Sequence, residues 1–508
     1  MQALERGLVD KLKLEKAVLD EVKTRRNLLP PEPWLHAIEQ RSSKVAAWVR
    51  TRLLSGVPNS AGVVISARKM GHGIRPVPVV GIAERITYRA LASHILKDQT
   101  LPTRSPEEYK EFVLGPISYA FEKVGRRRRV KVGESRIGYV VEADITAFYQ
   151  YVDHEVLRQE LYMQTGVITA VDRLMELLSD LSGRNFGVPQ LLDASDWLSE
   201  MYIRIVERTL LRRGLPTWRF NDDFRIGCKN YREALTSLEE LAYAAGDVGL
   251  VVGDHKTFTS TFMNYFFANT AVEVDEATAE FDPQDVEIAV TDYADMDEEE
   301  SIAAAVTTLG RLDAIFDENH IDLKNIRRDD LRDLRRALNA LSRNDDAQGL
   351  SNIKRLFQFV PALTPQVITY LVRMHPQQPE ETSRVWKSLL VESASDWQNL
   401  WLVYACREMR MLAQNSELLE WVEAQAHGRR QEALRAEAHL TLAREHAVSF
   451  VELDAALRSA PDALAPWYVL GMKELTNSEN PPSESQIKGL RQSSPLFSIL
   501  MEDDELEA

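Results

Sequence analysis

Cysteine is scarce in this chain. Cys228 and Cys406 are the only two among 508 residues, and they lie far apart in the sequence. A disulfide framework and a cysteine-based metal centre are therefore excluded. This cysteine usage is typical of a reducing compartment, so a cytoplasmic location is expected.

Long apolar runs are also missing. No stretch approaches the roughly 18–20 apolar residues that a membrane-spanning helix needs, and residues 1–8 lack the apolar core of a signal peptide. No membrane partner is expected. Apolar residues still make up 44% of the sequence, which is enough for ordinary globular cores. At 508 residues, two or more domains are expected.

Basic residues are absent from one long stretch, residues 257–310, where acidic residues are dense. Residues 1–256 carry 38 Lys and Arg against 33 Asp and Glu, whereas the remainder carries 23 against 44. The net charge of −16 thus comes from the second part alone. The first part could approach a polyanion, and the second would repel one. A domain boundary is expected near residues 270–300.

The second part is expected to be almost entirely helical. Residues 301–490 show helical apolar spacing with short breaks at proline and glycine, which favours antiparallel helix pairs stacked as an α-solenoid. No clean repeat period is present, so the solenoid is a structural hypothesis. Five tryptophans in this part are expected to pack in the core rather than form a ligand cage: Trp386, Trp397, Trp401, Trp421 and Trp467.

The N-terminal region predicts helices over residues 1–55, followed by two strands within residues 63–80. A glycine-rich turn joins the strands, and Lys69 and Arg75 flank it. Two interpretations are open for this hairpin: it grips phosphates, or it is a solvated basic turn. The same alternatives apply to the arginine run at residues 126–129.

Two adjacent carboxylates, Asp222 and Asp223, are predicted at the tip of a hairpin, because Asn-Asp-Asp lies between short apolar runs. On local evidence a solvated turn is the simpler interpretation. The alternative is a site for a hard divalent cation, which prefers oxygen ligands. Asp144 favours the second interpretation, since it ends an apolar strand that leads into a helix. Further along, residues 249–258 predict a strand, a turn and then Lys256.

The order strand–helix–helix–hairpin–helix–strand, with three carboxylates able to meet on one sheet, resembles the palm of reverse transcriptases. The resemblance covers about residues 60–265 and rests on five motifs in family order. These are Ile74-Arg-Pro-Val-Pro with the following Ala83-Glu-Arg-Ile, Asp144-Ile-Thr-Ala-Phe-Tyr, Gly187-Val-Pro-Gln190, Phe220-Asn-Asp-Asp223 and Gly249-Leu leading to Lys256-Thr257.

The resemblance implies two-metal phosphoryl transfer to dNTP substrates. Two Mg²⁺ or Mn²⁺ ions would be held by Asp144, Asp222 and the backbone carbonyl of Ile145, with Asp223 in support. Lys256 would neutralise the leaving pyrophosphate. The remaining expected substrate-binding residues are Lys69 and Arg75 at the triphosphate, Phe148 or Tyr149 beneath the sugar, and Gln190 in the template-positioning motif.

The sequence departs from the family pattern at three places, one of them on the template side. Asp193 and Asp196 follow Gln190, where carboxylates would repel a template backbone. Asn221 replaces the commoner Ala, Val or Met, and no basic thumb helix follows Lys256.

This layout resembles the bacterial abortive-infection and defence-associated reverse transcriptases, including the type carried by P2-like prophages. That resemblance implies an antiphage enzyme that makes DNA without a template. Synthesis would start from a hydroxyl group of the protein, and the DNA product would stay covalently attached to it. It also implies a homo-oligomer, a trimer or hexamer. The candidate priming residues include Tyr149, Tyr151, Tyr202, Tyr231, Tyr243 and Tyr265. The alternatives are a conventional RNA-templated reverse transcriptase and a non-catalytic scaffold or phage sensor.

The expected fold is therefore an α+β reverse-transcriptase palm and fingers followed by an all-α, HEAT-like helical-repeat domain. The expected division is N-terminal helices over 1–58, fingers and palm over 59–270, an acidic connector over 271–300, the helical-repeat domain over 301–495 and an acidic tail over 496–508.

Overall fold

The chain forms two compact units in the computed structural model. One contains residues 88–291, and the other contains residues 2–87 with residues 292–508. The boundary falls inside α5 (Ile82–Ile95). The structure describes residues 3–24, 26–69, 73–122, 130–270, 280–281, 298–310, 316–317, 320–321, 328–390, 394–413, 415–428 and 430–502.

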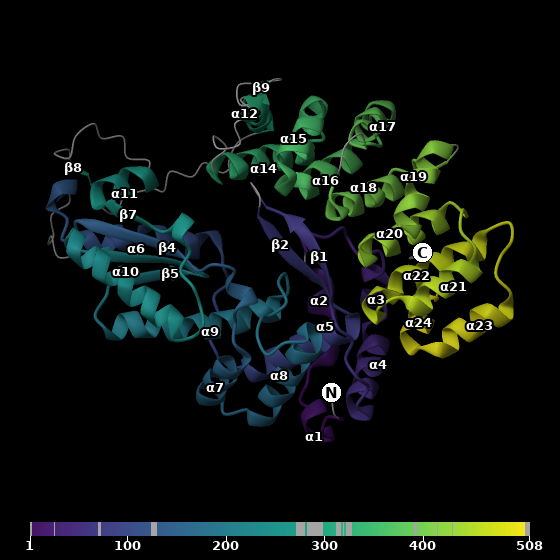
Figure 1. Cartoon of the computed structure of the whole chain (residues 1–508), viewed down its shortest axis with the longest axis horizontal. Helices are drawn as coiled ribbons and strands as arrows, with labels where there is room; N and C mark the ends of the chain where they lie inside the picture. The colour runs from purple at the N-terminus through teal and green to yellow at the C-terminus, as the bar shows by residue number, and fades with distance from the viewer. Residues whose placement is uncertain are drawn as a thin grey trace. The chain divides into compact units, whose positions relative to one another are not determined.

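A four-stranded antiparallel sheet in the order β5-β6-β4-β7 is the centre of the first unit (Figure 1). Its strands are β4 (Tyr139–Asp144), β5 (Thr217–Phe220), β6 (Asp223–Cys228) and β7 (Phe258–Thr261). β4 lies between β6 and β7, and its register with β6 places Asp144 opposite Asp223. The last residue of β4 therefore faces the first residue of β6.

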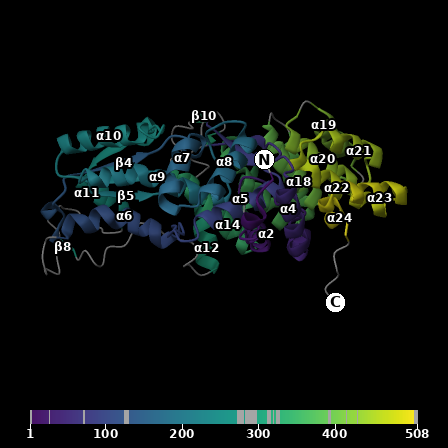
Figure 2. The ribbon, with the colours of Figure 1, turned by 90° about the horizontal axis from the view of Figure 1, so that it is seen from below.

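Helices cover both faces of this sheet. α10 (Tyr231–Gly246) lies on one side and α6 (Pro106–Phe121) on the other, as Figure 2 shows. α11 (Phe262–Asn269) shares the α6 side, where apolar side chains of both helices pack on Val140 of β4. Val140 and Val141 are both fully buried because successive residues of a strand point to opposite faces. The sheet is thus a rigid platform for residues at its edge.

The segment between β4 and β5 is helical, as the sequence predicts. It contains the short 3-10 turn η2 (Phe148–Gln150), then α7 (His154–Thr165), α8 (Ile168–Ser182) and α9 (Asp193–Arg212). The side chain of Asp153 caps α7 by accepting from the amides of Glu155 and Val156. The observed order matches strand–helix–helix–hairpin–helix, with α9 as one further helix.

One local prediction in this unit is wrong. A strand was expected before Lys256, but residues 249–253 form only an isolated bridge, between Val252 and Ile145. Lys256 ends the 3-10 turn η3 (Asp254–Lys256), and the strand β7 comes after it. The apolar run Leu250-Val-Val cannot distinguish a strand from an extended loop that touches the sheet once.

The second unit joins the N-terminal helices and one hairpin to the C-terminal helices. Its N-terminal elements are α1 (Arg6–Val9), α2 (Leu14–Lys23), α3 (Leu35–Gln40), α4 (Ser42–Ser55), β1 (Val63–Arg68) and β2 (Ile74–Val79). β1 and β2 pair antiparallel, as the glycine-rich turn predicts, and β1 packs on α18 (Asp396–Glu408). Trp397 of α18 also donates from its indole to the carbonyl of Leu28 at 2.7 Å. Residues far apart in the sequence thus share one core.

The even-numbered C-terminal helices form a row in which each helix packs on the next even-numbered one. The row runs from green to yellow in Figure 1. The row is α12 (Glu298–Gly310), α14 (Arg328–Arg343), α16 (Thr364–Met374), α18, α20 (Glu432–Arg444) and α22 (Ala465–Glu474). Helices between them flank the row: α15 (Ile353–Phe359), α17 (Pro379–Ser388), α19 (Ser416–His427) and α21 (Phe450–Ser459). Two short helices end the described chain, α23 (Glu484–Ser493) and α24 (Pro495–Leu500).

Four of the five tryptophans expected in the core are buried there: Trp386, Trp397, Trp401 and Trp467. The predicted tail differs from the structure, since it begins within α24, where Leu496 and Leu500 are buried. Two further pairs of two-residue strands occur among the described residues: β3 (Val130–Lys131) pairs with β8 (Glu280–Phe281), and β9 (Phe316–Asp317) with β10 (His320–Ile321).

Some predicted features lie outside the described residues: the arginine run at 126–129, most of the acidic connector and residues 503–508. Among the helices that the structure does describe, none is both long and apolar enough to cross a membrane.

Candidate active site

Three carboxylates meet at the edge of the sheet. Asp144 ends β4, Asp223 begins β6 opposite it, and Asp222 lies in the turn between β5 and β6. One ligand oxygen from each lies within 4.8 Å of the others. Asp144 is buried, and the other two are partly buried. The structure thus brings together the three aspartates that the sequence pattern placed on one sheet.

The turn that carries Asp222 depends on Asn221. It has only two central residues, Asn221 and Asp222, and Asn221 has a φ of 55°. Asparagine tolerates this left-handed conformation better than most residues. Its side-chain amide then donates to Asp222 Oδ1 at 2.8 Å, and the amide of Ile145 donates to the Asp222 carbonyl at 3.2 Å. Asp222 is therefore fixed through both its backbone and its side chain.

Lys256 reaches the same site from η3. Its Nζ lies 2.8 Å and 2.7 Å from the two carboxylate oxygens of Asp144. Gly253 makes this approach possible, because its amide donates to the Asp144 carbonyl at 2.7 Å. A Cβ at Gly253 would lie 2.8 Å from Thr146 Oγ1, closer than real contacts allow. The glycine therefore lets the chain turn tightly beside Asp144 and present the lysine.

The electrostatics of the site favour a cation. Burial is the largest cause that raises the pKa of Asp222, and the charge of Asp144 raises it further, while Lys256 and Arg104 act in the opposite direction. Like charges directly opposite on neighbouring strands, such as Asp144 and Asp223, destabilise a sheet unless they are compensated. A close set of carboxylate oxygens is what Mg²⁺ and Mn²⁺ prefer. The three aspartates therefore fit a hard divalent cation.

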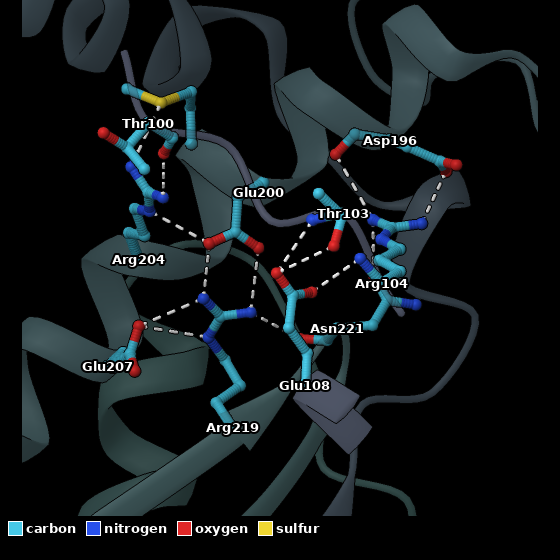
Figure 3. A network of polar contacts seen from close by, with 11 residues as sticks. Thr100, Thr103, Arg104, Glu108, Asp196, Glu200, Arg204, Glu207, Arg219 and Asn221 are labelled. Carbon is cyan, nitrogen blue, oxygen red and sulfur yellow. Dashed lines mark hydrogen bonds and ion pairs between the residues drawn. The ribbon is translucent and has the colours of Figure 1, made fainter. Parts of the chain in front are cut away.

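A partly buried arginine that the sequence did not reveal supports the hairpin tip. Arg104 donates from Nη2 to Asn221 Oδ1 at 2.9 Å and from Nη1 to the Tyr149 hydroxyl at 3.0 Å. It also pairs with Asp196 at 2.9 Å (Figure 3). The Tyr149 hydroxyl in turn donates to Asp196 Oδ1 at 2.5 Å. One guanidinium thus connects α9, the turn after β4 and the turn before β6.

A second arginine holds the same turn through its backbone. Arg219 donates from Nη1 to the carbonyl of Asn221 at 3.0 Å. Its guanidinium is fixed by Glu200 and Glu207, with donor–acceptor distances of 2.6–3.1 Å (Figure 3). Charge-assisted, multiply bonded arginines of this kind restrict geometry strongly. The tip of the hairpin is therefore held on its side-chain and main-chain groups at once.

Phe148 and Tyr149, the two candidates beneath the sugar, differ in their surroundings. Phe148 is only 2% exposed and packs against Tyr202, with ring centroids 6.5 Å apart. Tyr149 is partly buried. Burial, followed by the charge of Asp196, raises the pKa of the Tyr149 hydroxyl. Tyr149 therefore keeps its proton, and it is less buried than Phe148.

The Gly187-Val-Pro-Gln190 loop lies beside this aromatic pair. The amide of Val188 donates to the carbonyl of Tyr149, and that of Gly187 to the carbonyl of Val152, both at 2.8 Å. Gly187 has a φ of 88°, which few other residues adopt. Gln190 is partly buried at the end of the loop. Lys69 and Arg75 are exposed and belong to the other unit, so their expected contact with a triphosphate stays a prediction.

The two carboxylates on the predicted template side are paired with arginines, which the sequence analysis did not predict. Asp193 pairs with Arg89 at 2.7 Å, and Asp196 pairs with Arg104 at 2.9 Å. The two carboxylates were expected to repel a nucleic-acid backbone, but an arginine compensates each of them. The partners precede the aspartates by about a hundred positions, so the local sequence gave no sign of them.

Comparison with known proteins adds little to this geometry. No protein-family model and no curated protein matches the chain. Among solved structures, telomerase from Candida albicans in complex with a TWJ fragment of telomeric RNA has 12% identity and a TM-score of 0.33, over 72% of this chain and 64% of that chain. The corresponding telomerase from Candida tropicalis has 12% identity and a TM-score of 0.32, with the same two coverages.

The apo telomerase from Candida tropicalis has 11% identity and a TM-score of 0.32, over 72% of this chain and 68% of that chain. The chain thus spans about 64% of the length of the first two telomerases. At such TM-scores, these similarities identify neither the fold nor the activity of this chain.

Proposed function

We propose that this chain is a DNA polymerase related to reverse transcriptases, which adds dNTPs by metal-dependent phosphoryl transfer. The observation that supports this proposal is the meeting of Asp144, Asp222 and Asp223 within 4.8 Å at the edge of an antiparallel sheet, with Lys256 on Asp144. The same residues carry the reverse-transcriptase motifs of the sequence. A scaffold without activity would have no need to bury and orient mutually repelling carboxylates.

The residues that would hold Mg²⁺ or Mn²⁺ are Asp144, Asp222 and the backbone carbonyl of Ile145, with Asp223 in support. Two such ions, when bound, would lower the pKa of the attacking hydroxyl and stabilise charge on the entering and leaving oxygens. In the transfer itself, a hydroxyl oxygen bonds to the α-phosphorus of the dNTP, and the bond to pyrophosphate breaks.

The other residues of the site would bind and orient the substrates. Lys256 is placed to neutralise the pyrophosphate, and Lys69 and Arg75 would bind the triphosphate. We assign the surface beneath the sugar to Tyr149 rather than Phe148, because Phe148 is packed in the core. Gln190 would position the incoming nucleotide from the neighbouring loop.

The finer proposal is that synthesis needs no template and starts from a tyrosine of the protein. Its support is the sequence resemblance to abortive-infection enzymes and the lack of any Lys or Arg in β7 and α11, which follow Lys256. Asp193 and Asp196 do not support template-independent synthesis, since each carboxylate is paired with an arginine. A role in antiphage defence and a homotrimeric or homohexameric assembly rest on the same resemblance.

The structure narrows the candidates for the priming hydroxyl. Tyr202 and Tyr265 are buried, and the Tyr149 hydroxyl is bonded to Arg104 and Asp196. Three of the remaining candidates are exposed by 49%, 54% and 66%: Tyr151, Tyr231 and Tyr243 respectively. Tyr151 follows η2 directly and is the one nearest to Asp144 in the sequence. It is the first candidate to test.

The deciding experiment incubates the purified full chain with single dNTPs and Mg²⁺ or Mn²⁺, without nucleic acid, and resolves the protein by denaturing electrophoresis. We expect labelled DNA that stays with the protein until protease is added. DNA that appears only when RNA is supplied would support a conventional RNA-templated reverse transcriptase instead. No incorporation under either condition, with phage protection unchanged in an Asp222→Ala strain, would support a non-catalytic scaffold or phage sensor.

A further inference from the structure

Two histidines and a glutamate converge in the second unit, on three consecutive helices. His427 ends α19, His439 lies in α20, and Glu452 lies in the first turn of α21. One ligand atom from each lies within 4.8 Å of the others, and His427 Nε2 is 3.1 Å from Glu452 Oε1. This cluster has no part in the proposed polymerase chemistry.

The buried histidine has a defined tautomer. His439 Nδ1 lies 2.8 Å from the carbonyl oxygen of Arg435, and a carbonyl can only accept a hydrogen bond. Nδ1 therefore carries the proton, and Nε2 keeps a lone pair. Metal-binding histidines usually show this arrangement, with the second nitrogen donating to a backbone carbonyl or carboxylate.

The surroundings hold this ring but leave one side of the cluster open. His439 is 2% exposed, and its ring packs against Tyr468 with centroids 5.5 Å apart. The His427 ring meets it edge-on at 5.7 Å. By contrast, the side chains of His427 and Glu452 are 57% and 39% exposed. A buried, preset ligand thus lies beside two ligands that solvent can reach.

The neighbouring cation does not occupy the cluster. The Nε of Arg435, one turn before His439 on α20, donates to the carbonyl of Ala426 at 3.3 Å. The carboxylate of Glu452 supplies the opposite charge. Two imidazoles and one carboxylate are a donor set that suits Zn²⁺ and similar first-row ions, whereas Mg²⁺ prefers oxygen alone.

We propose that His427, His439 and Glu452 form a second metal site, which binds Zn²⁺ or a related transition-metal ion through two imidazole nitrogens and one carboxylate oxygen. The fourth position would take water from the exposed side, as in zinc sites with three protein ligands. The ion would link α19, α20 and α21, and would stabilise this end of the helical row. The simpler alternative is an exposed His427–Glu452 ion pair with no metal, which would contribute little to stability.

The test uses the full chain in an Asp144→Asn, Asp222→Asn background, so that the carboxylate site does not contribute. The protein is stripped with a chelator and titrated with Zn²⁺, and with Co²⁺ for its visible absorption. We expect one equivalent of Zn²⁺, a Co²⁺ spectrum of low-symmetry coordination and a higher thermal midpoint with Zn²⁺. His427→Ala and Glu452→Gln should each raise the dissociation constant more than about tenfold.

Both substitutions change exposed side chains, so the variants should fold without metal. His36→Ala, which removes another exposed histidine of the same unit, is the matched control and should bind Zn²⁺ like the parent. Failure of the parent to bind Zn²⁺ would overturn the proposal. So would equal Zn²⁺ affinity in the parent, His427→Ala and Glu452→Gln. Nucleotide incorporation is measured separately, on the chain with Asp144 and Asp222 intact. The Zn²⁺-binding result therefore does not depend on the proposed polymerase activity.

Discussion

Arg104 binds Asn221, the first residue of the two-residue turn that also contains Asp222, through a hydrogen bond of 2.9 Å from Nη2 to Oδ1. The same guanidinium donates to the Tyr149 hydroxyl and pairs with Asp196. Since Asn221 donates to Asp222, a carboxylate of the proposed metal site and the aromatic ring proposed beneath the sugar share one support. Their relative position therefore depends on a residue that touches neither the ion nor the nucleotide.

Replacing Arg104 by lysine should impair catalysis while the chain stays folded. A lysine has a single charged nitrogen and cannot reach Tyr149, Asp196 and Asn221 in the fixed fork of a guanidinium. We expect Arg104→Lys to lower the rate of dNTP incorporation by about 10- to 100-fold, because displacements of about 1 Å can have this effect. Steady-state kinetics on the purified variant measures it.

A positioning role also predicts a change in sugar selectivity. Arg104→Lys should lower the preference for dNTP over rNTP, since the Tyr149 ring loses one of its two hydroxyl contacts. Arg173→Lys is the matched control, because Arg173 pairs with Glu176 on α8, away from the hairpin. Loss of rate with unchanged sugar preference would contradict the link between Arg104 and Tyr149.

The parts of the site that the sequence predicts are those with local signals. An apolar run that ends at Asp144, and a turn-forming Asn-Asp-Asp between two strands, each indicate a strand end or a tip. The antiparallel register then places Asp144 opposite Asp223. Lys256 was placed correctly beside them, although its strand was expected on the wrong side, because a short apolar run does not fix where a strand begins.

The residues that the sequence did not reveal owe their position to tertiary packing. Arg104 lies in the loop before α6, with a φ of 55° and no motif around it. Its partners Asp196 and Asn221 follow about 90 and 120 positions later. In the sequence, Asn221 is only a replacement for the commoner Ala, Val or Met, whereas in the structure it both forms the turn and binds Asp222. No local pattern encodes pairs at this separation.

Asp144, Asp222 and Asp223 should not contribute equally to the rate of dNTP incorporation. Asp144→Asn and Asp222→Asn each remove a charged ligand, and we expect each to lower incorporation on the order of a thousandfold, about 4 kcal/mol of transition-state stabilisation. Asp223→Asn should have a smaller effect, since Asp223 supports the site. Single-turnover rates at saturating Mn²⁺ separate weaker metal binding from slower chemistry. An equal loss in all three variants would make Asp223 a full ligand.

In the metal-free chain, the raised pKa of Asp222 should make the free energy of unfolding depend on pH. Burial and the charge of Asp144 raise the folded-state pKa above the unfolded value, so the folded chain binds a proton that the unfolded chain lacks in the interval between them. The free energy of unfolding therefore falls as pH rises through the folded-state pKa. Asp222→Asn cannot ionise and should escape this loss.

Thermal unfolding in chelator, from about pH 4 to pH 7, measures the difference between Asp222→Asn and the parent. The variant should be the more stable protein at neutral pH, and the advantage should shrink as the pH falls. The comparison cancels the titration of all other groups that the substitution leaves unchanged. A difference independent of pH would show that Asp222 titrates alike in both states.

Lys256 should have opposite effects on metal binding and on catalysis. Its Nζ lies 2.8 Å and 2.7 Å from both oxygens of Asp144, which are the atoms a divalent cation would need. Removing this charge frees the carboxylate and leaves the aspartates less compensated. Lys256→Ala should therefore bind Mn²⁺ more tightly than the parent, yet add nucleotides more slowly, because the leaving pyrophosphate loses its cation.

Calorimetric titration with Mn²⁺ tests the tighter metal binding, and incorporation kinetics on the same preparation tests the slower nucleotide addition. Lys229→Ala is the matched control, as Lys229 is an exposed lysine of the same unit, and it should change neither quantity. Binding of dNTP should persist in Lys256→Ala. If dNTP binding is lost instead, Lys256 holds the nucleotide in its ground state, since a group that acts only on the leaving pyrophosphate would change the rate without abolishing affinity.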